Sequence, residues 1–274
     1  MLCPICASSR QQQRYSFPWG RILQCNDCTA AFTCGVDPDT ENRQAFVNCT
    51  DDGSVELYRQ WARERLDALQ GFISNGSLLE FGPGTGEFLY TAAAAGFQAT
   101  GIDRYVRLRP ANRHPNVSII ETDARSFRGR ASFDVVAAVH VLEHFNDPYQ
   151  LLSRAHENLK DSGYFLVEVP NFASMSRIIA GRRWRCFVRY HALQFTPQSL
   201  RTSLAKAHFK VLRLESVGCS ATQLLNLGIP FIARRFGVAL QANWQPGALV
   251  AKLATAIERS CCWGLNLRAV AQKQ

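Results

Sequence analysis

The sequence predicts an α/β protein in which a mostly parallel, seven-stranded sheet is covered by helices on both faces. Three observations support this prediction. Short apolar runs alternate with amphipathic stretches from residue 55 to residue 217, which is the rhythm of βαβ units. A glycine-rich turn follows the first of these runs, at the place where parallel sheets bind ligands. Two C-x-x-C motifs precede the alternating region and indicate a small additional module.

The first 35 residues predict a module that resembles a zinc ribbon. Cys3 and Cys6 form one C-x-x-C motif, Cys25 and Cys28 form the other, and 18 residues separate the two motifs. Two such turns can direct four thiolates at one ion, and a closed four-thiolate site is normally structural. Because so short a module buries little core, the metal would supply its folding free energy. The alternative is a set of unpaired thiols.

The rest of the chain divides into four segments. Residues 36–54 are polar and predict a linker, and apolar residues at helical spacing then predict an amphipathic helix over 55–74. This helix opens the core domain, residues 55–217, which is followed by a helical apolar insertion at 218–263 and by the last strand and tail at 264–274. Within the core, strands are predicted at 77–81, 98–103, 117–121, 134–139, 163–169 and 209–217, and helices at 86–95, 147–159 and 197–207.

The composition favours a folded protein of the cytoplasm. With 274 residues and 47% apolar content, the chain can bury a sizeable core. It has no uncharged apolar run of about 18 residues and no leader with a basic and then an apolar region, so neither a transmembrane helix nor a signal peptide is expected. In the cytoplasm its ten cysteines are expected to be thiols or metal ligands.

The positive charge of the chain is concentrated in one segment. Residues 172–213 contain nine basic residues and no acidic one, and the net charge of the whole chain is +9. Such a segment indicates an anionic partner: a phosphorylated substrate, a membrane surface or nucleic acid. The alternative is a solvated basic face. The apolar stretch 222–240, which carries two arginines, predicts either peripheral membrane contact or a helical cap or dimer face.

The glycine-rich turn has a distinctive spacing. Gly82, Gly84 and Gly86 stand at alternate positions, and Glu80 precedes the first of them by two residues. Nicotinamide and flavin folds instead favour G-x-G-x-x-G. The alternative interpretation is a structural glycine turn in another kind of α/β protein.

Acidic residues follow the next two predicted strands. Asp103 ends the second strand, 17 residues after Gly86, and a carboxylate there can accept both ribose hydroxyls of an adenosine group. Asp123 follows the third strand, where it can accept from the exocyclic amine of adenine with the Ala124 backbone close by. Asp103 alone is a feature shared with NAD-binding folds.

Taken in order, these motifs resemble those of the class I S-adenosylmethionine (SAM) dependent methyltransferases, which have a Rossmann-like fold. The resemblance extends to Leu142-Glu143-His144 after the fourth strand and to the H-x-x-x-F-T-P segment from His191 to Pro197, which are similar to segments of small-molecule O-methyltransferases. The added four-cysteine module is similar to that of zinc-containing sugar C-methyltransferases. The resemblance covers residues 76–217 and 1–35, and nothing specific is recognised in 218–263.

The resemblance implies a role for each residue of the cofactor site. The glycine turn would pass under the methionine part of SAM, and Glu80 would face its amino group directly or through water. Asp103 would hold the ribose, Asp123 would hold the adenine amine, and Arg104 would flank the adenine or remain solvated. His140, just past the fourth strand, would lie near the methionine and the sulfonium.

Histidines supply the candidate catalytic bases. A methyltransferase must place a nucleophile in line with the C–S bond, and a base removes the proton of a hydroxyl or carbon acid. His144 and His191 are the candidates because histidine titrates near neutral pH, and the alternative for each is a capping or core histidine. Alone, His140-x-x-Glu143-His144 is also a metalloprotease pattern, but here its first histidine directly follows a strand. Glu143 is expected to cap or pack at a helix start.

The resemblance implies that the basic stretch 177–189 covers the substrate. Arginines bind phosphates bidentately, so a nucleotide-linked sugar or a lipid phosphate fits this stretch. Trp184 and Phe187 are expected to stack on a ring or to enter a membrane interface. The arginines expected to hold the anionic substrate are Arg182, Arg183, Arg185 and Arg189.

The sequence as a whole therefore predicts SAM-dependent methyl transfer to a small-molecule or phosphate-linked acceptor, such as a nucleotide-sugar, glycan or lipid precursor. One alternative is an RNA methyltransferase, which the basic segment suits, although the charge is confined to that segment. The other is a catalytically silent scaffold that binds SAM or a partner.

Overall fold

The structure is a computed structural model, and it describes residues 1–37, 55–106, 108–109, 112–218 and 263–274. Nearly all of the predicted linker and of the predicted apolar insertion, including the stretch 222–240, therefore lies outside the described residues.

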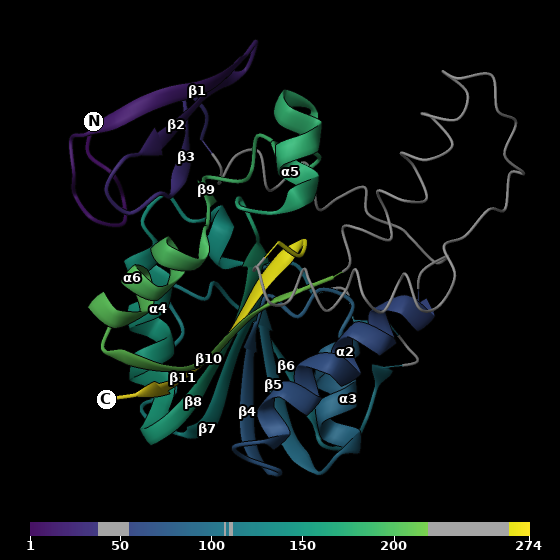
Figure 1. Cartoon of the computed structure of the whole chain (residues 1–274). Helices are drawn as coiled ribbons and strands as arrows, with labels where there is room; N and C mark the ends of the chain where they lie inside the picture. Colours follow the sequence, from purple (N-terminus) through teal and green to yellow (C-terminus); the bar gives the residue numbers. More distant parts are fainter. Residues whose placement is uncertain (38–54, 107, 110–111, 219–262) are drawn as a thin grey trace, which may run out of the picture.

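The core is a seven-stranded sheet, as predicted (Figure 1). Five neighbouring strands, in the order β8-β7-β4-β5-β6, run parallel. The remaining two complete one edge, where β11 lies antiparallel between β10 and β8. The strands are β4 (Gly76–Phe81), β5 (Phe97–Asp103), β6 (Val117–Glu121), β7 (Phe133–Val139), β8 (Leu159–Pro170), β10 (Phe209–Val217) and β11 (Asn266–Lys273).

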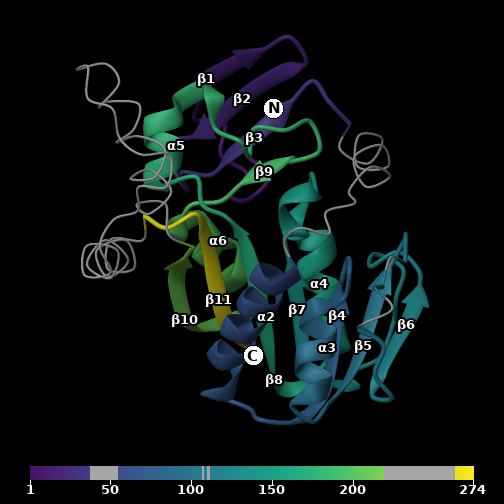
Figure 2. The same ribbon diagram turned by 90° about the vertical axis from the view of Figure 1, so that its right-hand side faces the viewer.

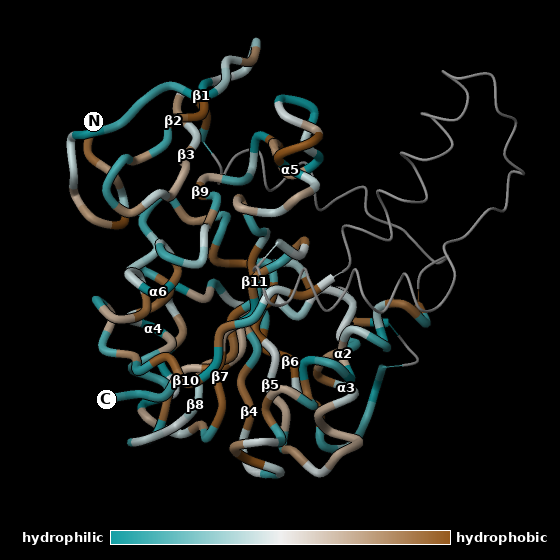
Figure 3. Tube along the Cα trace, viewed as in Figure 1, coloured by the Kyte–Doolittle hydropathy of each residue, from teal (hydrophilic) through white to brown (hydrophobic). Residues whose placement is uncertain are grey.

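Helices cover both faces of this sheet because its strands are apolar on both sides (Figures 1 and 2). Along β4, Leu78 packs with the helices of one face and its neighbour Leu79 with those of the other. The hydrophobic residues are accordingly concentrated in the central strands (Figure 3). Among the described residues, no helix combines the length and apolar character that crossing a membrane requires. The helices are α2 (Val55–Gln70) and α3 (Glu87–Ala94) on one face, and α4 (Pro148–Asn158) and α6 (Pro197–Lys206) on the other.

The N-terminal residues form a second sheet that includes a strand from the far end of the core. Its order is β1-β2-β3-β9, where β1 is Gln11–Phe17, β2 is Gly20–Cys25, β3 is Ala31–Cys34 and β9 is Leu193–Gln194. The two residues of β9 pair with Ala31 and Phe32. The four-cysteine module is thus joined to the core by backbone hydrogen bonds, and Figure 2 shows β9 at the base of the module.

A small aromatic core fills the space between the module and the segment after β8. Phe172, Trp184 and Phe187 pack together with Ile22 and Ala31 of the module. The Trp184 and Phe187 rings lie 5.1 Å apart and are 4% and 8% exposed. The expectation that these two rings enter a membrane interface is wrong, because both are buried where the module packs against the core. The segment also holds the short helix α5 (Met175–Ala180) and a 3-10 turn, Gly181–Arg183.

Candidate functional site

A cavity of about 830 Å³ lies at the carboxyl ends of the parallel strands, where open α/β sheets bind ligands. It is the place where the structure gathers the residues that the sequence singled out. Of the predicted site residues in the core, Gly86 is the one that does not line it. Those that do are Glu80, Gly82, Gly84, Asp103, Arg104, Asp123, Ala124, His140, His144 and His191.

Glycine stands at two positions of the turn for different structural reasons. Gly84 has a φ of +56°, and a Cβ added to it would meet no atom within 4 Å, so its backbone borders open space in the cavity. Gly86 has a φ of +88° and precedes α3, and a Cβ there would collide with the side chain of Leu108. Gly84 therefore leaves room for a ligand, whereas Gly86 leaves room for the side chain of Leu108.

Glu80 is a buried carboxyl group at the end of β4. Its side chain is 3% exposed, and among the described residues its Oε2 has no hydrogen-bond partner. Burial raises the pKa of Glu80 to about 8, although the positive charge of Arg65 opposes the rise. A buried, unsatisfied acceptor facing a cavity is the arrangement expected where a ligand supplies the missing donor.

The acids after β5 and β6 also line the cavity. Asp103 accepts a hydrogen bond at Oδ1 from the backbone N–H of Tyr105, at 2.9 Å. Asp123 accepts from the guanidinium groups of Arg104, whose Nε lies 2.8 Å away, and of Arg125, whose Nη2 lies 2.9 Å away. The structure thus places Arg104 against Asp123, at the cavity wall.

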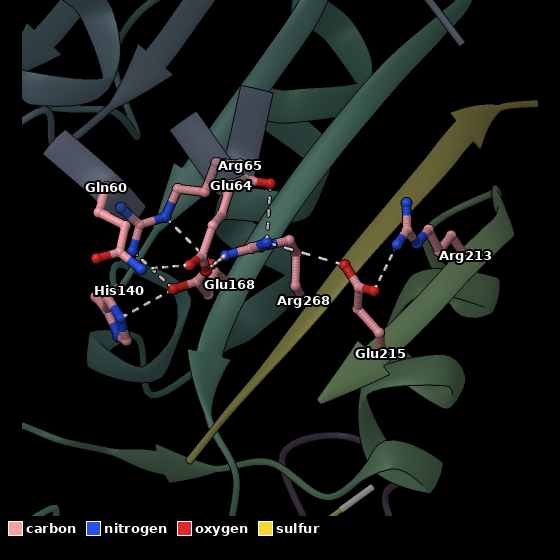
Figure 4. Close-up of polar contacts among 8 residues, drawn as sticks. All are labelled: Gln60, Glu64, Arg65, His140, Glu168, Arg213, Glu215 and Arg268. Carbon is pink, nitrogen blue, oxygen red and sulfur yellow. Dashed lines mark hydrogen bonds and ion pairs between the residues drawn. The ribbon is translucent and has the colours of Figure 1, made fainter. Parts of the chain in front are cut away.

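A buried ion network joins the cavity to the helix α2 and the strand β11 (Figure 4). Arg65 binds Glu168 bidentately, at 2.7 and 3.1 Å, and Arg268 Nε donates to the same carboxylate at 2.8 Å. Burial alone would raise the pKa of Glu168, but these charges and His140 hold it well below its usual range. Neither Arg65 nor Arg268 is among the site residues predicted from the sequence. The sequence does contain a signal for Arg65. It follows Trp61 and Ala62 at helical spacing and so puts a charge on the apolar face of α2.

His140 lies between the network and the rest of the site. It follows β7 with a φ of +55°, a conformation that costs free energy in a residue with a Cβ. Its Nδ1 is 3.3 Å from Glu143 Oε1 and its Nε2 is 3.5 Å from Glu168 Oε1. Burial by itself would lower the pKa of His140, but the two carboxylates outweigh it and raise the pKa to about 9. The ring is therefore a cation at neutral pH.

The two candidate bases differ in their hydrogen bonds. The Nδ1 of His144 lies 2.9 Å from the Tyr190 carbonyl oxygen and its Nε2 lies 3.1 Å from that of His140. Both ring nitrogens of His144 thus face carbonyl oxygens, which only accept hydrogen bonds. The Nδ1 of His191 donates to the Cys186 carbonyl oxygen at 3.0 Å, which leaves Nε2 as an acceptor. Burial lowers the pKa of His191 to about 4, against the opposing charge of Glu143, so this ring is neutral.

Glu143 is buried beside these histidines in the first turn of the 3-10 helix Leu142–His144, so it packs at a helix start, which is one of the two roles expected of it. Burial would raise its pKa, but the hydrogen bond from His140 and the charges of the histidines lower it. Glu143, His144 and His191 bring ligand atoms within 4.8 Å of one another. Both nitrogens of His144 also lie within hydrogen-bond distance of carbonyl oxygens, so hydrogen bonds to the backbone hold this cluster in place.

The four cysteines of the module converge on one point. The Sγ atoms of Cys3 and Cys28 are 3.5 Å apart, as are those of Cys6 and Cys25, and all four lie within 4.8 Å of one another. Cys6 is half-buried and the other three are buried. Four convergent sulfur atoms shielded from solvent are the donor set of a closed structural zinc site.

The predicted arginines divide into one at the cavity and three outside it. Arg185 is exposed and lines the cavity mouth. Arg183 and Arg189 are also exposed but do not line it. Arg182 lies against the module, where its guanidinium contacts the Ser16 carbonyl oxygen and the ring of Phe17.

Comparisons with known proteins agree with this arrangement. The profile of the family described as "Methyltransferase domain" matches residues 55–214, which is more than half of the chain. A search of curated proteins found no match.

Similar solved structures share the fold. One is the Burkholderia thailandensis 1,6-didemethyltoxoflavin-N1-methyltransferase with bound 1,6-didemethyltoxoflavin and S-adenosylhomocysteine, at 16% identity and a TM-score of 0.58, covering 96% of this chain and 99% of that one. A SAM-dependent methyltransferase from Archaeoglobus fulgidus has 18% identity and a TM-score of 0.55, covering 86% of this chain and 99% of that one.

A seven-stranded sheet with an acid-flanked glycine turn at its ligand-binding edge defines a class I methyltransferase fold. The chain belongs to the methyltransferase domain family.

Proposed function

We propose that the enzyme methylates a small-molecule acceptor that carries an anionic, phosphate-linked group, and that His191 is the base. The observation that carries this proposal is the single cavity that connects the glycine turn to the neutral ring of His191 and to Arg185 at its mouth. Donor, base and anion-binding group thus border the same volume. A nucleotide-sugar, glycan or lipid precursor with a phosphate group would fit a cavity that is bordered by these groups.

The residues at the strand ends fit the methyl donor. The unpaired Oε2 of Glu80 suits an amino group, and the open backbone at Gly84 suits a ligand lying against it. Asp103, Asp123 and Ala124 border the same cavity, and we assign them to the adenosine part of the donor. When bound, SAM supplies a methyl group on a positively charged sulfur, which makes that group reactive toward a nucleophile.

His191 has the protonation state that a base requires. Its Nδ1–H is held by the Cys186 carbonyl oxygen, so Nε2 can accept the proton of an acceptor hydroxyl. The nearby carboxylate of Glu143 stabilises the cation that then forms. We assign His144, whose nitrogens both face carbonyl oxygens, to positioning the His140 and Tyr190 backbone rather than to proton removal.

We propose in addition that Cys3, Cys6, Cys25 and Cys28 hold a structural Zn²⁺. The convergence of their sulfur atoms and their burial support this assignment. No ligand position is left for a reacting group, so the metal would act through folding.

The acceptor class is tested with uridine diphosphate (UDP) as a probe. In calorimetric titrations with S-adenosylhomocysteine present, we expect UDP to bind the wild type and to lose at least about tenfold in affinity in Arg185→Ser, because an exposed arginine at the mouth supplies a phosphate contact. Arg213→Ser, which removes an exposed arginine paired with Glu215 on β10, is the matched control and should leave the affinity unchanged. Equal UDP binding by wild type and Arg185→Ser would contradict the proposal that the acceptor carries an anionic group.

Binding of SAM is expected to release a proton. In the free protein the pKa of Glu80 is about 8, so at about pH 6.5 the carboxyl group is protonated, and an ammonium group beside it favours the ionised form. Release should approach one proton at about pH 6.5 and fall to zero as the pH rises above about 8. Calorimetry in two buffers of different ionisation enthalpy measures it. Glu80→Gln should release none, and a wild type that behaves like this variant would contradict the assignment.

A further inference from the structure

The segment that carries His191 is held between the two sheets of the molecule. On one side β9 pairs with β3 of the four-cysteine module. On the other side Phe195 forms a parallel bridge with Asn171, at the end of β8, and its carbonyl oxygen accepts from Phe172 N–H at 2.7 Å. The backbone around His191 is therefore fixed by contacts from both directions, and one of these comes from residues far away in sequence.

Thr33 of β3 makes the contact closest to His191. Its hydroxyl donates to the His191 carbonyl oxygen at 2.6 Å, and its backbone N–H donates to the Ala192 carbonyl oxygen at 2.8 Å. The Gln194 amide also donates to the His191 carbonyl oxygen, at 3.2 Å, and lies 3.4 Å from the Thr33 hydroxyl. Thr33 is 9% exposed, so water does not readily replace its hydroxyl.

The ring of His191 depends on this backbone position. Its Nδ1 reaches the Cys186 carbonyl oxygen at 3.0 Å, and this contact selects the tautomer in which Nε2 is an acceptor. A backbone shift of a few tenths of an ångström at residue 191 would lengthen it, because hydrogen bonds weaken steeply with distance and angle. The titratable groups that face the ring are Glu143, His144, His140 and Tyr190, whose ring centroid lies 5.2 Å from that of His191.

We propose that Thr33 is a positioning residue for His191, so that the four-cysteine module is a structural part of the active site. The proposal rests on His191 being the base of the proposed function. Thr33 does not touch the acceptor, and it acts through the backbone of residues 191 and 192.

The test is the tautomer and pKa of His191, read by NMR of the full-length, metal-loaded chain labelled with ¹⁵N-histidine. His191→Asn identifies the signal. Thr33→Val keeps the shape of the side chain and removes the hydroxyl, and Thr33→Ser keeps the hydroxyl. Tyr149→Phe is the matched control, since it removes another partly buried contact between core and module, the 2.7 Å hydrogen bond to the Ile5 carbonyl oxygen, away from His191.

In the wild type, in Thr33→Ser and in Tyr149→Phe we expect one neutral tautomer, protonated at Nδ1, over the physiological pH range. In Thr33→Val we expect a mixture of both tautomers and a pKa raised by about one unit or more toward the value of a solvated imidazole. An unchanged His191 signal in Thr33→Val would overturn the proposal, as would an equal change in Tyr149→Phe.

Titrations of the same samples with S-adenosylhomocysteine and UDP separate this result from the proposed function. Ligand binding that persists in Thr33→Val shows that the variant is folded, so an unchanged signal then counts against Thr33 alone. A wild type that binds neither ligand contradicts the proposed function, whereas the NMR comparison still decides the role of Thr33.

Discussion

Replacing Glu168 by alanine is expected to lower the free energy of unfolding by about 3–5 kcal/mol, the cost of breaking a buried ion pair by removing one partner. Glu168 is 2% exposed and is the carboxylate that Arg65 and Arg268 share. Without it, two buried guanidinium groups would lie side by side with the cation of His140. The network joins α2, β8 and β11, so the loss should affect the whole core. Urea unfolding at neutral pH, followed by circular dichroism, measures it.

Two controls separate the buried charge from ordinary loss of a side chain. Glu56→Ala breaks the exposed pair with Arg63, whose partners are 54% and 79% exposed, and should cost less than about 1 kcal/mol. A triple change to apolar residues at 65, 168 and 268 should recover much of the stability lost in Glu168→Ala, because it leaves no charge uncompensated. If Glu168→Ala is as mild as Glu56→Ala, the network does not stabilise the fold as the structure indicates.

Removal of the proposed zinc ion is expected to have the second large effect. One equivalent of Zn²⁺ should be released per chain when a mercurial reagent blocks the thiols. No such release is expected from Cys3→Ser. Structural zinc contributes many kcal/mol to small modules, so we expect the melting temperature of the apoprotein to fall by at least about 10 °C. The loss should spread beyond the module, since β3 pairs with β9.

Cys34→Ser is the matched control for the metal. Cys34 is buried in the same module but lies outside the two C-x-x-C motifs and the convergent group. Its replacement should leave the zinc content at one equivalent. Zinc loss in Cys34→Ser, or a wild type that carries no zinc after expression in zinc-supplemented medium, would contradict the assignment.

Much of the core could be predicted from the sequence because its signals are local. The apolar run that becomes β4 ends at Glu80 and the glycine turn, and the strand ends at Asp103 and Asp123 likewise mark one edge of a parallel sheet. Such an edge gathers residues from several strands, so their presence around one cavity follows from the pattern.

The remaining features depend on contacts between residues far apart in the chain. A two-residue strand such as β9 has no periodicity to detect, and its pairing with Ala31 spans more than 150 residues. The burial of Trp184 and Phe187 follows from that pairing, because the module covers them. The roles of His144 and His191 could not be separated either, since they are decided by which carbonyl groups face each ring nitrogen.

The pairing of β3 with β9 also has a consequence for biosynthesis. Thr33 and His191 are 158 positions apart, so at about 5–20 residues per second the ribosome needs roughly 8–30 s to produce the second after the first. During that interval the edge of β3 lacks its partner strand, and Ile22 and Ala31 of the module lack the aromatic side chains that later pack against them. The nascent module must therefore keep its shape by local means, and metal capture by the four cysteines, all made within the first 28 residues, is available from the start. Zinc supply during translation would then influence the yield of folded enzyme, as well as the stability of the finished one.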